Sequence, residues 1–83
     1  MFRVFLEEKA YKQLEKLSKK NKESIIKKLK MLEKGFSYRL DIKKLKGYQG
    51  HYRLRVGKFR ILFYLEGIDI VIYKIGKRED IYG

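Results

Sequence analysis

The sequence of 83 residues contains no cysteine, no proline and a single histidine. Without cysteine there is no disulfide, no thiolate nucleophile and no cysteine-ligated zinc. Small secreted domains usually need disulfides, which favours a reducing compartment for this chain. No apolar run approaches the roughly 18 residues of a membrane helix, and the acidic Glu7 and Glu8 make the first residues unlike a signal peptide. These absences predict a soluble, cytoplasmic protein.

The groups that usually carry catalysis are also scarce. His51 has no carboxylate near it in the sequence, which favours an incidental residue over a catalytic one. The acidic residues are scattered and no glycine-rich phosphate loop is present, so we expect neither a metal ion nor a cofactor. The histidine–glutamate pair of the usual metal-free ribonuclease is missing. A nuclease built from this sequence would depend on substrate positioning and charge stabilisation.

Acidic side chains are outnumbered. The sequence has 10 Asp and Glu residues and 22 Lys and Arg residues, which gives a formal net charge of +12. Self-repulsion of this size destabilises a small domain, so such an excess is typical of proteins with a polyanionic partner. A lysine-rich surface of the thermophilic kind is the alternative explanation, but its charge networks need both signs. The composition therefore favours nucleic acid, or else an acidic protein, as the partner.

Hydrophobic patterns divide the chain into a short strand, two helices and a run of strands. Apolar residues alternate over 2–6, recur at helical spacing up to about Ser18, and do so again from Ile25 to Leu32 after a polar break at 19–22. The period then changes to two, which predicts strands over 42–46, 52–56, 59–65 and 68–75. We therefore predict a single α+β domain over residues 1–83. It comprises an N-terminal strand, an antiparallel helical hairpin and a three- to four-stranded antiparallel meander, with the helices packed on one sheet face.

A two-residue turn at Gly57-Lys58 sets the register of the central hairpin. It pairs Val56 with Phe59 and Arg55 with Arg60. Because side chains alternate along a strand, one face then carries Tyr52, Leu54, Val56, Phe59, Ile61 and Phe63. A second turn, expected at Glu66-Gly67, adds Ile68, Ile70 and Ile72 to that face. This apolar face is the predicted core beneath the helices.

The opposite face is predicted to carry Arg53, Arg55 and Arg60, with Tyr73 across from Arg60. Like charges directly opposite each other destabilise a sheet, and no acid from the flanking strands is expected beside them. Guanidinium groups bind phosphate bidentately and a tyrosine ring can stack on a base, so this face suits RNA. A solvated outer face with unrelated cations is the alternative. The tail after the last strand either reaches the same ligand or frays.

Four segments in this order resemble the RelE/ParE toxin superfamily, and most of all its RelE-like branch of mRNA interferases from type II toxin–antitoxin pairs. The segments are KKLKG at 43–47, YRLRVG at 52–57, FRILFY at 59–64 and IGKREDIY at 75–82. The resemblance implies a toxin that enters the ribosomal A site and cuts mRNA there by attack of a 2′-hydroxyl on phosphate, without a metal. It also implies a RelB-like antitoxin as partner, and operator DNA binding only by the toxin–antitoxin complex.

The resemblance also assigns roles to individual residues. The catalytic set that it implies comprises Arg53, Arg55, Arg60, Arg78 and Tyr82. Contacts to RNA are expected from Lys46, Tyr73 and Lys77. The family often has lysine where Arg53 stands, and a guanidinium is a poor general base. Arg53 is therefore assigned to charge stabilisation, which leaves the proton acceptor unassigned.

Two other functions are compatible with the same pattern. The first is a ParE-like toxin that inhibits DNA gyrase by binding the protein, since one fold can host both activities. The second is a non-toxic basic module that binds RNA or the ribosome with a strong salt dependence. The arginines that share a face and the terminal tyrosine favour the nuclease over both.

Overall fold

One five-stranded sheet organises the molecule, in the order β1-β5-β4-β3-β2. The computed structural model describes residues 1–82, except for the side chain of Tyr82. Along the chain the elements are β1 (Arg3–Leu6), α1 (Glu8–Glu15), α2 (Lys19–Leu32), β2 (Asp41–Lys44), β3 (His51–Val56), β4 (Phe59–Glu66), β5 (Asp69–Lys77) and α3 (Arg78–Tyr82). Strands β2 to β5 form an antiparallel meander, and β1 pairs with β5 in parallel. The α+β fold expected from the sequence is confirmed.

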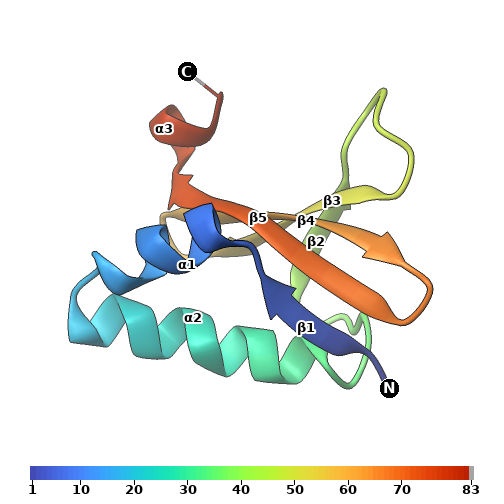
Figure 1. Cartoon of the computed structure of the whole chain (residues 1–83), viewed down its shortest axis with the longest axis horizontal. Helices are drawn as coiled ribbons and strands as arrows, with labels where there is room; N and C mark the ends of the chain where they lie inside the picture. Colours follow the sequence, from blue (N-terminus) through green and yellow to red (C-terminus); the bar gives the residue numbers. More distant parts are fainter. Residues whose placement is uncertain (83) are drawn as a thin grey trace.

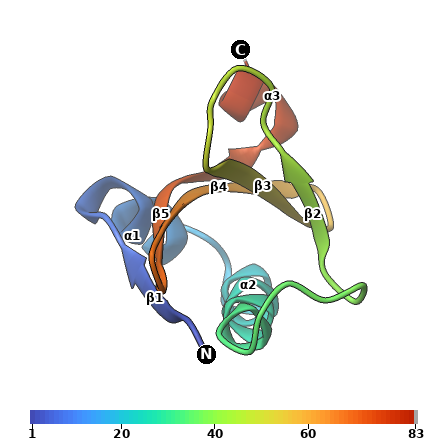
Figure 2. The same ribbon diagram turned by 90° about the vertical axis from the view of Figure 1, so that its right-hand side faces the viewer.

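The sheet has helices on two sides. Figures 1 and 2 show α2 beneath one face and α3 above the other, with α1 beside β1 and β5. The core lies between the sheet and α1 and α2, where helical and strand residues form one buried cluster. Its fully buried members include Ile25, Leu32, Leu54, Ile61, Phe63, Ile70 and Ile72. Within residues 1–82 no helix is long and apolar enough to cross a membrane.

The boundary between α1 and α2 differs from the prediction. The polar stretch expected to break the helices, 19–22, is instead the first turn of α2, and α1 ends at Glu15. The cause is Ser18, whose hydroxyl accepts a hydrogen bond from the backbone N–H of Asn21 at 3.2 Å. Ser18 is therefore the N-cap of α2, and the lysines that follow it favour the helical conformation. The polarity of residues 19–22 was thus not evidence of a loop.

The register of the β3–β4 hairpin is as predicted, with Val56 opposite Phe59 and Arg55 opposite Arg60. Gly57 opens the turn with φ 58°, a conformation that a side chain would strain. The second hairpin turn was misplaced by one residue, because Glu66 pairs with Asp69 and leaves Gly67 and Ile68 as the turn. Ile68 is consequently 52% exposed and does not belong to the core.

The shifted turn and a β-bulge in β5 together overturn the predicted position of Tyr73. Leu62 pairs with Lys74 but the next residue, Phe63, pairs with Ile72, so Tyr73 is the extra residue. The residue across from Arg60 is therefore Gly76. Strict pairing counted from the predicted turn could not give the Arg60–Gly76 pair. The turn lies one residue later than predicted, and the bulge adds a residue to one strand only.

Candidate nucleic-acid interface

Arg53, Arg55 and Arg60 share the sheet face that lies away from α2, as the sequence predicted. Their strand neighbours Leu54, Val56, Phe59 and Ile61 are buried in the core on the other face. Since side chains alternate along a strand, the three arginines point to the opposite side. We call this surface of β3 and β4 the arginine face.

Arg60 is a half-buried cation without a carboxylate partner among the described residues. Its Nη1 donates two long hydrogen bonds, at 3.4 Å to the carbonyl of Gly57 and at 3.3 Å to that of Phe59. Its Nε is buried and has no hydrogen-bond partner in the described part of the chain. Leaving such a donor unpaired costs about 1–3 kcal/mol or more for a charged group. An anionic oxygen bound here would remove that cost.

Arg55 differs from Arg60, and here the expectation that no acid flanks the arginines was wrong. Asp41 of β2 lies directly opposite Arg55, and its Oδ2 accepts a hydrogen bond from Nε at 2.8 Å. The sequence placed the start of this strand at Ile42, one residue too late to include the acid. Both side chains of the pair are about half exposed, so an RNA phosphate can compete with Asp41 for the guanidinium.

The third arginine, Arg53, occupies the middle of the face. It is partly buried, and its neighbours across the ladder are Lys43 on β2 and Leu62 on β4. Leu62 is itself 8% exposed on this outer side of the sheet. The arginine face is thus not purely polar, because an apolar residue sits between its cations.

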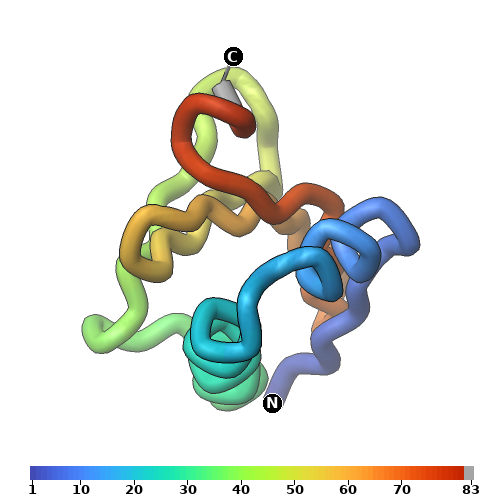
Figure 3. The backbone as a smooth tube through the Cα atoms, turned by 90° about the vertical axis from the view of Figure 1, so that its left-hand side faces the viewer, coloured from blue at the N-terminus to red at the C-terminus, as the bar shows by residue number. Residues whose placement is uncertain are grey.

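Helix α3 covers one end of the arginine face. Ile81 is buried and packs over Gly76, where an added Cβ would lie 3.5 Å from Ile81 Cδ1. Lys74 donates to the Ile81 carbonyl at 3.5 Å. The last turn of the chain is seen above the sheet, on the side away from α2, in Figure 3. Because Gly76 is opposite Arg60, this packing holds the start of α3 at the Arg60 end of the face.

The remaining residues predicted to contact RNA are distributed around this face. Arg78 is exposed at the first position of α3, close in sequence to Gly76. Lys77 aligns with Phe59 and so occupies a register position of the core side at the end of β5, not of the arginine face. Tyr82 ends α3, but its side chain lies outside the described part of the structure, so its stacking role stays a prediction.

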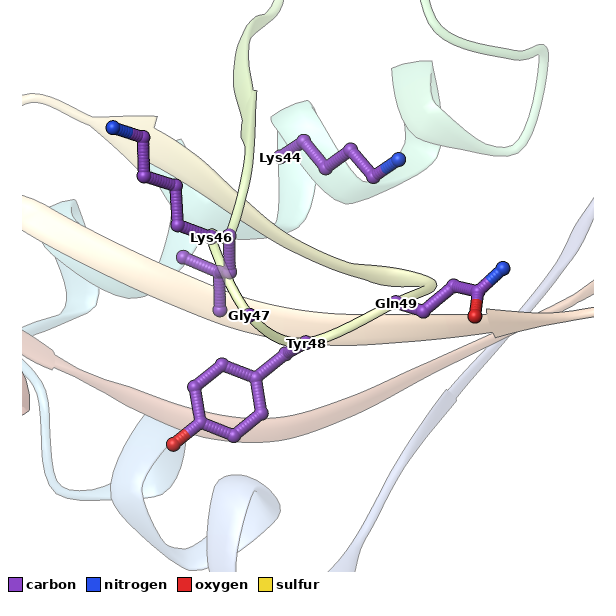
Figure 4. A pocket seen from close by; sticks show the side chains of 6 residues that line it. Lys44, Lys46, Gly47, Tyr48 and Gln49 are labelled. Atoms are coloured by element: carbon purple, nitrogen blue, oxygen red, sulfur yellow. The ribbon is translucent and has the colours of Figure 1, made fainter.

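Lys46 belongs to the loop between β2 and β3. The side chains of Lys46, Tyr48 and Gln49 in this loop, and of Lys44 at the end of β2, point in different directions in Figure 4, around an open pocket of about 500 Å³. The loop and α3 rise from the same face of the sheet at its two ends (Figure 1). Lys46 is therefore placed on the correct side of the sheet to meet a ligand that lies along the arginine face.

Between the loop and α3 lies a groove that sequence reasoning missed. We call it the aromatic groove; it has a volume of about 650 Å³ and is lined by Leu45, Lys46, Tyr48, His51, Leu62, Tyr73 and Ile81. His51 is the first residue of β3, not a loop residue, and its Nδ1 is 3.0 Å from Tyr73 Oη. The rings of Tyr48, Tyr64 and Tyr73 surround its imidazole at centroid distances of 5.9, 5.6 and 5.5 Å.

The hydroxyl of Tyr73 is perturbed by this environment. Burial, and to a lesser degree the nearby Tyr48 and Glu7, raise the pKa of Tyr73 above its ordinary value. Tyr73 therefore remains a neutral hydroxyl throughout the physiological range of pH. His51 and Tyr73 are 22 residues apart, on β3 and β5, which do not pair with each other, so their contact could not be read from the local sequence.

No group of three His, Asp or Glu side chains that could hold a metal ion is found within residues 1–82. What the interface offers chemically is an open, cationic strip beside aromatic rings. Guanidinium groups can neutralise phosphate, and the rings provide surfaces on which bases stack.

Comparison with known proteins identifies the family. Residues 4–82 match the family model described as the ParE toxin of the type II toxin–antitoxin system parDE. The chain belongs to the RelE/ParE toxin superfamily. Toxin RelE3 of Methanocaldococcus jannaschii is 46% identical to it over 44 residues, which is 53% of this chain and 50% of the relative. The match to such curated RelE/ParE relatives thus spans about half of their length.

Solved structures of RelE-type complexes share the fold over nearly the whole chain. The RelB–RelE antitoxin–toxin complex of Methanococcus jannaschii matches with a TM-score of 0.82 and 30% identity, over 95% of both chains. The archaeal RelE–RelB complex of Pyrococcus horikoshii matches with a TM-score of 0.78 and 25% identity, over 93% of this chain and 94% of the other. The superfamily inferred from four short segments is confirmed.

Proposed function

We propose that this RelE/ParE-type toxin is an endoribonuclease that cuts mRNA on the ribosome, through attack of an RNA 2′-hydroxyl on the adjacent phosphate. The observation that carries this proposal is the guanidinium of Arg60. It is half-buried, unpaired by any described carboxylate and left with an unsatisfied Nε on an otherwise open face. Keeping this cation partly desolvated is unfavourable in the free protein. The cost is offset when an anion binds, most of all one whose negative charge increases during the reaction.

The proposed chemistry follows from that charge. When the 2′-oxygen attacks, negative charge builds up on the non-bridging phosphate oxygens, and preorganised donors at that position lower the barrier. Arg60 supplies such donors, and Arg55 supplies more once phosphate displaces Asp41. Loss of one donor of this kind typically costs about 10²–10³ in rate.

The shape of the site favours a large assembly as the source of substrate positioning. The arginine face is a strip of sheet bounded by α3 and a loop, not an enclosed cleft, so it cannot by itself hold a flexible strand in line for attack. A ribosome that presents mRNA in its A site would supply that order. The RelB chains in the two archaeal complexes support an antitoxin as the second partner of this chain. We further propose that operator DNA is bound only by the toxin–antitoxin complex.

The test is a cleavage assay on ribosomes programmed with a defined mRNA, read by primer extension. We expect the wild type to cut inside codons and to leave 5′-hydroxyl ends. Arg60→Ala should lower the rate by about 10²–10³ without loss of folding. Arg39→Ala is the matched control, since Arg39 is an exposed loop arginine outside the arginine face.

Intact mRNA during growth arrest would reject the proposal. Inhibition of gyrase supercoiling in that case would establish the ParE-like alternative. Harmless expression together with salt-sensitive RNA binding would instead establish the non-toxic RNA- or ribosome-binding module.

A further inference from the structure

The proposed cleavage requires a group that takes the proton of the attacking 2′-hydroxyl. A guanidinium group is a poor general base, so the arginines of this face cannot serve. Asp41 is engaged by Arg55 at 2.8 Å. Histidine is the residue type that ordinarily takes up a proton near neutral pH. His51 lies on this face, and none of the ion pairs among the described residues includes it.

We propose that the imidazole of His51, oriented by Tyr73, is the proton acceptor for cleavage, and that the aromatic groove holds the ribose and base on the 2′-hydroxyl side of the scissile phosphate. This inference rests on the proposed ribonuclease function. It gives a chemical role to the one histidine of the chain, which local sequence context had marked as incidental.

The strand geometry places His51 within reach of the arginines. His51 and Arg53 are two residues apart on β3 and share a face, which separates their Cα atoms by about 7 Å. Arg55 follows at the same spacing. A phosphate held above Arg53 therefore has His51 on one side and the Arg55–Arg60 pair on the other, as an acceptor and a charge-stabilising group should be.

The hydrogen bond to Tyr73 engages Nδ1 and leaves Nε2 as the ring nitrogen for catalysis. When Nδ1–H donates to Tyr73 Oη, 3.0 Å away, the lone pair of the neutral imidazole is on Nε2. Within residues 1–82 no hydrogen bond occupies Nε2, so it is available to a ligand in the groove. The raised pKa of Tyr73 keeps its hydroxyl neutral, and the oxygen of a neutral phenol can accept this hydrogen bond. Tyr73 thus acts as a positioning residue, not as a base.

The groove has the size and lining that a nucleoside needs. Its volume is about 650 Å³, and its lining includes the aromatic Tyr48 and Tyr73, the apolar Leu62 and Ile81, and the cationic Lys46. Stacking on such rings is worth about 1–3 kcal/mol per base in single-strand binders and is tolerant of sequence. Lys46 is placed to meet the next phosphate of the strand.

The step balances without another reactant. The 2′-hydroxyl gives its proton to His51 Nε2, the 2′-oxygen forms a bond to phosphorus, and the bond from phosphorus to the 5′-oxygen breaks. The leaving 5′-oxygen takes a proton from water, and His51 then returns its own proton to solvent. The products are a 2′,3′-cyclic phosphate and a 5′-hydroxyl end.

The deciding experiment uses single-turnover cleavage of mRNA on programmed ribosomes. His51→Asn is the sharp variant, because its amide can replace Nδ1 in the bond to Tyr73 but has nothing in place of Nε2. We expect its rate to fall by about 10²–10⁴, the usual contribution of a general base. His51→Ala should fall as far and regain activity when free imidazole is added, whereas Arg60→Ala should not respond to imidazole.

Tyr73→Phe tests the positioning role. We expect a several-fold lower rate at saturating toxin with unchanged affinity for the programmed ribosome, because only the orientation of the imidazole is lost. Tyr38→Phe, an exposed loop tyrosine, is the control.

The outcomes separate the two proposals. A wild type that does not cut mRNA removes the proposed function. A wild type that cuts, together with undiminished cleavage by His51→Asn or a His51→Ala variant that imidazole does not rescue, removes only His51 as the acceptor.

Discussion

At the scale of single residues, the two arginines that face each other across β3 and β4 are held differently. Directly opposed like charges are unfavourable in a sheet. Asp41 offsets this for Arg55 through an exposed ion pair at 2.8 Å, while Arg60 has no described carboxylate partner and retains a buried, unsatisfied Nε. The acid that eases the repulsion would compete with a phosphate for the guanidinium of Arg55.

Removal of that competitor should strengthen RNA binding. For Asp41→Asn we expect a lower dissociation constant for single-stranded RNA, and a log–log salt slope that is steeper by about 0.7, as for one more phosphate contact. Because the pair is exposed, the free energy of unfolding should change by no more than about 1 kcal/mol. Fluorescence anisotropy over a NaCl titration measures both the affinity and the slope.

The matched control for this prediction is Asp69→Asn. It breaks the ion pair of Asp69 with Arg3 at 2.8 Å, at the other edge of the sheet. A slope that is the same in the wild type and both variants would show that Asp41 does not compete with RNA.

At the scale of elements, α3 depends on its contact with the sheet. Five residues are too few for a helix to persist in water by propensity alone. Its stability comes from Ile81, which is 8% exposed, and from the close approach that Gly76 permits. This contact also fixes the position of Arg78 at the start of α3. A core-packing residue, Ile81, therefore supports the position of a predicted site residue.

Ile81→Ala should therefore detach α3. We expect a loss of about 2 kcal/mol in the free energy of unfolding, near the lower end for truncation of a buried isoleucine, and faster amide exchange over residues 78–81. Urea denaturation and hydrogen–deuterium exchange measure these effects. Glu79→Ala, an exposed change in the same helix, is the control. Unaltered protection of these amides would mean that Ile81 does not anchor the helix.

At the scale of the whole molecule, a net charge of +12 is confined to a body whose Cα extents are 31 × 26 × 25 Å. The screening length is about 30 Å at 0.01 M salt and about 10 Å at 0.1 M. At low salt nearly every cation repels every other, whereas at higher salt only neighbours interact. Folding and RNA binding should thus respond to salt in opposite directions.

We expect the Tm of the isolated chain to rise by several degrees between about 0.01 and 0.1 M NaCl, while RNA affinity falls over the same range. Differential scanning calorimetry and anisotropy titrations measure the two trends. In the double variant Lys19→Glu, Lys20→Glu each exchange removes two units of charge, and both salt dependences should weaken. A Tm that falls with added salt would contradict the account of self-repulsion.

Sequence reasoning succeeded where the determinants are close together in the chain. The pairing of Arg55 with Arg60 follows from a two-residue turn at Gly57 and from strict alternation on both sides of it. The family was likewise recognisable from short ordered segments within residues 43–82, and the family model matches residues 4–82. The predictions were wrong by one residue at the second turn and at the start of β2. The second error left Asp41 outside the predicted strand, so its pairing with Arg55 was missed.

The sequence alone determined the α+β class, the apolar face, the common face of three arginines and the excess of positive charge, because periodicity, turn residues and composition are local properties. Only the tertiary structure decided that Asp41 meets Arg55, that Tyr73 at the bulge meets His51, and that α3 closes the Arg60 end of the face. These features join residues that are far apart in the chain. Their register is set by how the core packs, where a single added residue in one strand moves a side chain from one face of the sheet to the other.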